Sequence, residues 1–332
     1  MPELTWGMPV ILYLFMAGVG AGAVTVSSSV LLRGGGGGFG GSYFTLARYG
    51  ALIGPIPVMV GTFLIVFELG RPFRMLNLFK VINLSPMNIG SWLLLLFIFV
   101  SLFYALAFLP SLFAKFERLS DRLTSFRIVL AWVLVPLGIG VAVYTGIMLG
   151  AMPSRPLWNS PILALLFLIS ALSTGVATIT LARAVLHRTS PGLKEDRRLK
   201  GRRTTGRIGR RFDESGYLLA AADLVLIGFE LMVIFLFLMF AHLTVGNVKY
   251  AVNFILPGGE MAGMFWLWVV LIGLLIPSIV ELYYVIPKLL YQKAFYPPRY
   301  IDLAVPLAVL IGGFMLRYVI VVVGQLTGPM GL

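Results

Sequence analysis

The feature that most constrains this chain is a series of long apolar runs separated by short polar links. A helix of about 20 apolar residues crosses the hydrocarbon core of a bilayer, and a helix satisfies its own backbone hydrogen bonds there. The 332 residues are 59% hydrophobic and 12% charged, as expected of a polytopic membrane protein. We predict an all-α integral membrane protein with eight transmembrane helices packed as helical bundles, forming a single membrane domain over residues 1–332. The runs cover residues 6–32, 46–69, 89–112, 126–149, 160–186, 217–245, 263–290 and 303–324.

The distribution of basic residues predicts how these helices are oriented. Of the 26 Lys and Arg residues, ten lie between Arg188 and Arg211. The links after the first, third, fifth and seventh helices carry most of the others, so they are expected in the cytoplasm. Both termini then face outward, toward the periplasm, and 188–215 is a basic cytoplasmic loop that can contact anionic lipid headgroups. The net charge is +13, but ten of the 26 basic residues lie in this one loop, so the charge follows membrane topology and we expect no nucleic-acid partner.

Residue counts restrict the cofactors that the protein can hold. It has no cysteine, so it holds no disulfide and no iron–sulfur cluster. Its two histidines, His187 and His242, fall near opposite membrane faces, about 30 Å apart. We therefore expect no haem, and no metal site is predicted.

Ionisable residues within the apolar runs are functional candidates, because charge is costly inside a membrane. Asp223 and Glu230 are seven residues apart, so they share a helix face at about 10 Å separation, and His242 lies about 18 Å further along. This row predicts a proton path. The alternative is that the acids pair with Arg317 or with hydroxyl groups and stabilise helix packing, which we favour for Asp223, and we expect Glu281 to form a structural ion pair.

A second group of polar and aromatic residues gathers at the outer ends of the helices. Such a mixture fits a quinone, which needs an apolar slot, hydrogen-bond donors for two carbonyl oxygens and a group that exchanges protons. A single Tyr or Trp here can instead belong to the interfacial aromatic belt, the interpretation that we prefer for Trp6 and Trp158. The predicted quinone-binding residues are Tyr13, Glu68, Arg71, Trp92, Tyr144, Arg155 and His242, and proton transfer is predicted for Glu68, Asp223, Glu230 and His242.

One stretch stands out within this group, because a carboxylate ends an apolar run beside two arginines. Glu68-Leu69-Gly70-Arg71-Pro72 is followed by Phe73 and Arg74, and then by Ser85-Pro86-Met87-Asn88-Ile89-Gly90-Ser91-Trp92. Two interpretations stay open. The acid either forms a salt-bridged helix end or belongs to one wall of a reaction site.

These motifs resemble the NrfD/PsrC family, the membrane subunits of polysulfide-reductase-type complexes. Arg155-Pro156-Leu157-Trp158-Asn159 and the first helix, from Tyr13 to Gly22, are also similar to that family. The resemblance implies a cofactor-free subunit of a prokaryotic inner (cytoplasmic) membrane. Such a subunit exchanges electrons between menaquinone or ubiquinone and an outward-facing, four-cluster ferredoxin-like iron–sulfur subunit, often with a molybdenum or tungsten pterin catalytic subunit.

The resemblance also implies roles for single residues. Tyr144 matches a quinone-contacting tyrosine of the family, and Glu68 is the acid of the Glu-Leu-Gly-Arg-Pro motif. Tyr13 stands near a position where the polysulfide reductase subunit has a quinone-contacting histidine, so the sequence departs from the family there. Two alternatives are an ion- or proton-translocating subunit that uses Asp223, Glu230 and Glu281, and a membrane anchor without its own site. Enzymatic activity of the subunit itself is left open.

Overall fold

The predicted number of membrane-crossing helices is confirmed. The computed structural model describes residues 6–34, 42–68, 80, 85–109, 117–186, 205–244, 246–291, 295 and 297–327. Within these residues, eight helices are long and apolar enough to cross a membrane, and no strand is present. The protein is therefore an all-α membrane protein.

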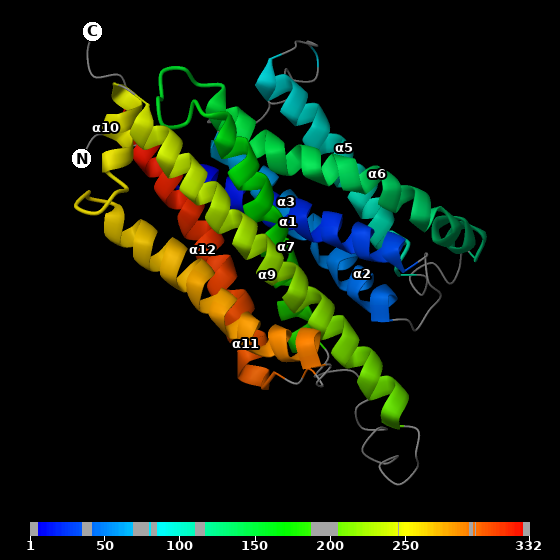
Figure 1. Ribbon diagram of the computed structural model, residues 1–332. Helices are drawn as coiled ribbons and strands as arrows, with labels where there is room; N and C mark the ends of the chain where they lie inside the picture. The colour runs from blue at the N-terminus through cyan, green and yellow to red at the C-terminus, as the bar shows by residue number, and fades with distance from the viewer. Residues whose placement is uncertain are drawn as a thin grey trace.

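Most spans are single helices, and two are built from consecutive helical segments (Figure 1). The second span breaks at Gly54, directly before Pro55, which cannot donate the backbone hydrogen bond that a continuous helix would need. The seventh span changes from a π-helix to an α-helix directly before Pro277, at Ile276. The elements are α1 (Met8–Arg33), α2 (Ser42–Ile53), α3 (Pro55–Glu68), α5 (Pro86–Leu106), α6 (Glu117–Gly150), α7 (Pro161–Leu186), α9 (Thr205–Leu243), α10 (Asn247–Asn253), η3 (Met264–Leu275), α11 (Ile276–Tyr291) and α12 (Arg299–Leu326).

Two helices extend well beyond the apolar runs that predicted them. α6 begins at Glu117 rather than near 126, and α9 begins at Thr205 rather than near 217. Residues 205–215, which we expected in the basic loop, are therefore helical. Hydropathy marks only the part of a helix that crosses the membrane, whereas Arg and Glu support a helix that continues into water. The short helix α10 was not predicted.

The first helix lies at the centre of the packing. In α1, 78% of the most apolar 18-residue window is buried inside the protein, the largest share of any span. It packs against α2, α3, α6, α7 and α12, and α7 in turn packs against α6, α9 and α12. α1 and α7 lie very close together because both carry glycine at the contact. A Cβ on Gly22 would collide with the Ala171 carbonyl, and one on Gly175 with the backbone of Gly22.

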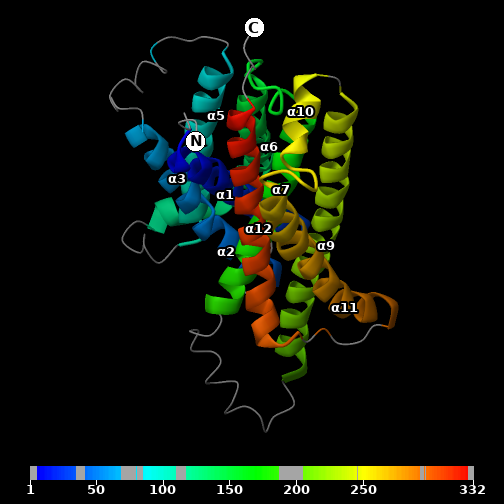
Figure 2. The ribbon, with the colours of Figure 1, turned by 90° about the vertical axis from the view of Figure 1, so that its left-hand side faces the viewer.

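Both described ends of the protein lie at the same end of the bundle, as an even number of spans requires (Figure 2). The Trp6 backbone N–H donates to Gln325 Oε1 at 2.8 Å, and Gln325 Nε2 donates back to the Trp6 carbonyl at 3.1 Å. We call this the terminal end. It holds the beginnings of α1, α5 and α7 and the ends of α3, α6, α9 and α12; the other is the opposite end. The prediction that the terminal end faces outward stays a prediction.

Candidate functional site

Two of the predicted quinone-binding residues lie together at the terminal end. Tyr13, near the beginning of α1, is 3% exposed, and Tyr144, near the end of α6, is 8% exposed. Their phenol groups are close enough to interact electrostatically. Glycines make room for both residues: a Cβ on Gly90 of α5 would overlap the Tyr144 ring, and one on Gly61 of α3 would lie 3.3 Å from Tyr13 Cα. Four spans therefore meet around the pair.

The two hydroxyl groups have little to bind within the protein. Tyr144 Oη donates to the thioether of Met148 at 3.6 Å, and sulfur is a weak acceptor. No residue that the structure describes accepts a hydrogen bond from Tyr13. Buried hydroxyl groups normally have a partner, so the pair retains the capacity to donate to a carbonyl-bearing ligand.

The acidic motif continues from the helix that packs on Tyr13. α3 ends at Glu68, seven residues and about 10 Å after Gly61, so the two positions are in helical register. Position 68 therefore lies on the same face of α3 as Gly61, closer to the terminal end. The side chain of Glu68 and the whole of Arg71 lie outside the described part of the structure, so their roles stay predictions.

The second part of the motif forms the beginning of α5. Ser85 is the N-cap residue, and its Oγ accepts from the Asn88 backbone N–H at 3.3 Å. Pro86 takes the first helical position, where its missing N–H costs nothing. This start places Gly90 against Tyr144. Trp92, two residues further, lies about 200° away around the helix and is 43% exposed, so the structure does not bring it to the tyrosine pair.

Arg155 and Trp158 attach the segment between α6 and α7 to the end of α12. Arg155 Nη1 donates to the Gln325 carbonyl at 2.6 Å, and Trp158 Nε1 donates to the Ile320 carbonyl at 2.8 Å. Trp158 is 1% exposed, so its expected place in a lipid-facing aromatic belt is wrong. Gly324 provides the space for its ring, because a Cβ there would collide with the indole. Arg155 binds carbonyl oxygen at a helix C-terminus, a stabilising use of a cation.

The structure places His242 at the terminal end but apart from the tyrosine pair. It is exposed near the end of α9, which packs against α2, α7, α10 and α11. Tyr144 is on α6, which packs against α1, α5 and α7, and α5 lies on the side of the bundle away from α9 (Figure 2). The predicted roles of His242 in quinone binding and proton transfer have no supporting contact in the described structure and stay predictions.

A second polar cluster lies in the membrane interior between α7, α9 and α12. Arg317 is fully buried, and its Nη1 donates to Ser170 Oγ at 3.1 Å and to the Gly313 carbonyl at 2.7 Å. Glu230 is also buried, and it lies close enough to Arg317 for their charges to interact, although the two groups form no ion pair within 4 Å. Gly18 of α1 leaves room for the guanidinium group, because a Cβ there would lie 2.7 Å from Arg317 Nη2. Proximity to Arg317 is what the packing alternative predicted for Glu230.

Glu281 does not form the structural ion pair that we expected. It lies within hydrogen-bonding reach of another carboxyl group, that of Asp223, which also accepts from Ser173 Oγ at 3.0 Å. Sequence spacing gives the face of a residue on its own helix but not its neighbour on another helix. The prediction for Glu281 was wrong for that reason.

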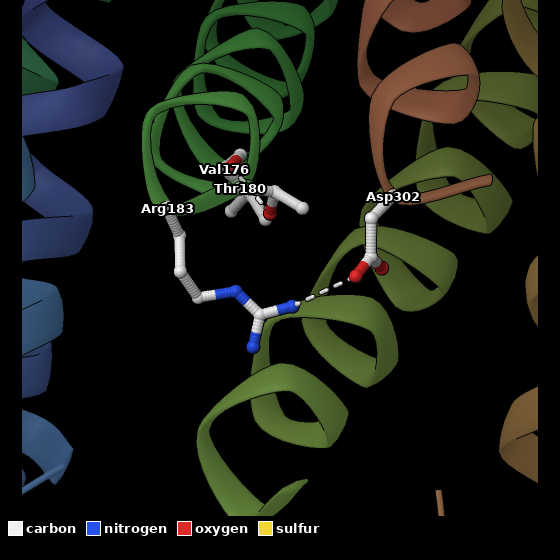
Figure 3. A network of polar contacts seen from close by, with 4 residues as sticks. All are labelled: Val176, Thr180, Arg183 and Asp302. Atoms are coloured by element: carbon white, nitrogen blue, oxygen red, sulfur yellow. Dashed lines mark hydrogen bonds and ion pairs between the residues drawn. The ribbon is translucent and has the colours of Figure 1, made fainter. Parts of the chain in front are cut away.

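The sequence interpretation also missed an ion pair near the opposite end. Arg183 Nη2 lies 3.7 Å from Asp302 Oδ2, and the Arg183 side chain is 5% exposed. Figure 3 shows Arg183 reaching from α7 to Asp302 near the start of α12, below Thr180. The available signal was the occurrence of opposite charges in the last turn of α7 and the first turn of α12.

The fold and the buried polar groups define a polytopic helical membrane protein with a buried pair of tyrosines at its terminal end. Residues 1–329 match the family described as "Polysulphide reductase, NrfD", so the chain belongs to the NrfD family of integral membrane proteins. It is similar to "Protein NrfD" of Escherichia coli K12, with 29% identity over 98% of this sequence and 96% of that protein. It is also 29% identical to the C subunit of the polysulfide reductase of Wolinella succinogenes, over 84% of this sequence and 83% of that subunit. A "Protein NrfD homolog" of Haemophilus influenzae is 26% identical over 98% and 96% of the two sequences.

Proposed function

We propose that the protein is the quinone-reactive membrane subunit of a respiratory oxidoreductase complex, with its quinone site at the terminal end. The observation that carries this proposal is the buried pair of phenols, Tyr13 and Tyr144, whose donor capacity the described residues leave almost unused. A quinone presents two carbonyl oxygens, which are the acceptors that such donors need. The surrounding spans supply the apolar walls for the ring and its tail.

In this proposal Tyr13 and Tyr144 orient the ligand by donating to its carbonyl oxygens. Glu68, which follows in register on α3, exchanges a proton with the bound quinone, and Arg71 favours the ionised form of that acid. Arg155 positions the loop beside the site through its contact with α12. Trp92 and His242 are not included in the site wall.

The proposal also assigns partners. The protein has no cysteine, so electrons from quinol have to pass to a redox group in another subunit. We propose an outward-facing, four-cluster ferredoxin-like iron–sulfur subunit in contact with the terminal end, and a molybdenum or tungsten pterin subunit beyond it, in a prokaryotic inner membrane. The similarity to a protein named as one subunit of a polysulfide reductase supports a multi-subunit assembly.

Tyr144→Phe tests the site, because it removes one hydroxyl group and leaves the ring on Gly90. Loss of one hydrogen bond costs about 1 kcal/mol, so a fluorescent quinol analogue should bind about fivefold more weakly. The measurement is a fluorescence titration of the purified protein in lipid nanodiscs.

The matched control is Tyr104→Phe, since Tyr104 is also fully buried but contacts Ser27 near the opposite end of α5. The Tyr104→Phe protein should bind the quinol analogue with the same affinity as wild type. Equal affinities in wild type and Tyr144→Phe would remove Tyr144 from the site, and equal losses in both variants would show a general effect of lost phenols.

A second candidate function is proton translocation. The sequence leaves this alternative open because acidic residues occur within the membrane spans. The observation in its favour is the pair of buried carboxyl groups, Asp223 and Glu281, far from the tyrosine pair along the helices. A membrane anchor without a site is the third alternative. It predicts no quinone binding by the purified protein.

A further inference from the structure

A pocket opens between α7, α9, α11 and α12 toward the opposite end of the bundle. It is about 30 Å³ in size, enough for about two water molecules. Its titratable lining residues are Arg183, Asp223, Glu281, Tyr284 and Asp302. Gly216 and Asp223 both line it and are seven residues apart on α9, so the pocket extends about 10 Å along that helix. Arg183 is in the last turn of α7 and Asp302 in the first turn of α12, so this ion pair lines the part of the pocket nearest the opposite end of the bundle.

Among the described residues, the carboxyl groups around this pocket outnumber the cations. The charges therefore balance only if some of these carboxyl groups are protonated. Arg183 pairs with Asp302, and Arg317 interacts with Glu230. Asp223 and Glu281 then face each other, with Ser173 as a neutral donor to Asp223. Among the described residues, the other titratable group beside them is the Tyr284 phenol of α11.

Glu281 has a carboxylate oxygen without a partner inside the described protein. Its side chain is 8% exposed, and its Oε2 is buried and accepts no hydrogen bond from a described residue. Two carboxyl groups at hydrogen-bonding distance cannot both ionise in a low-dielectric interior, so one proton has to be shared between them. The pocket places water within reach of that proton.

We propose that this pocket is a proton-entry site, through which the Asp223–Glu281 pair takes up a proton from the membrane face where α7 ends. Water in the pocket carries the proton past the Arg183–Asp302 ion pair to the carboxyl groups. No other co-reactant takes part, since one O–H bond forms on a carboxylate as one breaks in hydronium or water. This site is separate from the tyrosine pair and needs no quinone.

The series of polar groups continues inward and then stops. Ser173, which binds Asp223, is one helical turn from Ser170, which accepts from Arg317 Nη1, and Glu230 is close enough to interact with the Arg317 charge. Beyond that point the Arg317 guanidinium group lies against the rings of Phe15 and Phe167, at 5.7 and 5.3 Å from their centroids. The described polar groups therefore form a half-channel that ends at Arg317.

Infrared spectroscopy of the purified, quinone-free protein in nanodiscs tests the protonated pair. Wild type should show a protonated-carboxyl absorption at neutral pH that shifts in D₂O, because water reaches the pair. Asp223→Asn and Glu281→Gln should each remove or shift this band. Glu260→Gln is the control, because Glu260 is an exposed acid and its replacement should leave the band unchanged.

Two infrared results would overturn the proposal. One is a wild-type spectrum whose carboxyl band survives both Asp223→Asn and Glu281→Gln. The other is loss of the band when sodium chloride replaces choline chloride at constant pH, which would make the pair a Na⁺ site. Neither measurement depends on quinone, so failure of the quinone proposal would leave this test unaffected.

Cysteine labelling tests the entrance without altering the acids, and the cysteine-free protein is a suitable background. Ala220→Cys lines the pocket and should react with a small, membrane-impermeant thiol reagent in proteoliposomes. It should react only from the face opposite to the one that labels Glu260→Cys, and Ala177→Cys, fully buried in α7, should not react. Absence of Ala220→Cys labelling from both faces, or labelling from the Glu260 face, would contradict the proposed entrance.

Discussion

The three buried tyrosines that the structure describes differ in what their hydroxyl groups can bind. Tyr104 contacts Ser27 at 3.3 Å, so its polar atom is satisfied inside the protein. Tyr144 has only the Met148 thioether, and Tyr13 has no acceptor among the described residues. Burial alone therefore does not distinguish a structural phenol from a ligand-binding one. Unused donor capacity is what makes Tyr13 and Tyr144 the candidates for ligand binding, and both lie at one end of the bundle.

Tyr13 gives a test of donor chemistry that does not depend on Tyr144. Tyr13→Phe should weaken binding of the quinol analogue about fivefold, since one donor is lost. Tyr13→His should bind within about twofold of wild type, because an imidazole N–H can replace the phenol as donor. Fluorescence titration measures both. If the His variant bound as weakly as the Phe variant, hydrogen-bond donation at this position would not explain binding.

Arg317 gives a test of the buried charge pair. Arg317→Met should lower the free energy of unfolding by about 3 kcal/mol or more, because Glu230 would be left charged and uncompensated in the interior. Adding Glu230→Gln to this variant should restore part of the loss. Thermal unfolding in detergent measures this, with the exposed Lys249→Met as control. Equal stability of wild type and Arg317→Met would show that the pair contributes nothing.

The sequence was a better guide to which residues matter than to which residues surround them in the fold. Both members of the tyrosine pair were named from the sequence: topology placed them near the outer helix ends, and the resemblance to the NrfD/PsrC family singled out Tyr144. The sequence failed for Glu281 and Trp158, whose surroundings come from other helices. Asp223 approaches Glu281 from α9, and the space for Trp158 exists because residue 324 of α12 is glycine.

At the scale of elements, small residues decide how closely the central helices approach. Gly18 and Gly22 form a small-residue step typical of helix packing, and Gly22 does contact α7. Gly18 has a different use, because it faces the Arg317 guanidinium group of α12. The motif predicted close approach on this face of α1 but could not predict that one of its glycines accommodates a charged side chain.

Gly22→Ala tests the α1–α7 contact. The added methyl group would overlap the Ala171 carbonyl, and such overpacking costs about 1–3 kcal/mol. Gly228→Ala is the matched control, because a Cβ at Gly228 meets nothing within 4 Å, and its helix should gain slightly in stability. Thermal unfolding of both variants gives the comparison. A Gly22→Ala protein as stable as Gly228→Ala would mean that the helices do not approach this closely.

At the scale of the whole molecule, the eight apolar runs predicted the architecture because hydrocarbon thickness fixes the length of a span. The runs could not predict where α6 and α9 begin, since both helices continue past the apolar region. Nor could they predict that α1 and α7 occupy the middle of the bundle. The resulting fold separates two polar regions, with the tyrosine pair near the terminal end and the carboxyl pair toward the opposite end.

This separation gives the two proposed sites different tests. The tyrosine pair involves α1 and α6, with α3 and α5 beside it, whereas the carboxyl pair joins α9 and α11. Substitutions at one site should therefore leave ligand binding or protonation at the other unchanged, as expected for distant residues without shared partners.

The quinone content of the protein purified with its native lipids tests the central claim most directly. Extraction and chromatography should find a stoichiometric amount of quinone in wild type and in Tyr104→Phe. The double variant Tyr13→Phe/Tyr144→Phe should lose most of it while keeping the same thermal stability. Wild-type protein without quinone, or a double variant that retains the full amount, would contradict a quinone site between α1 and α6.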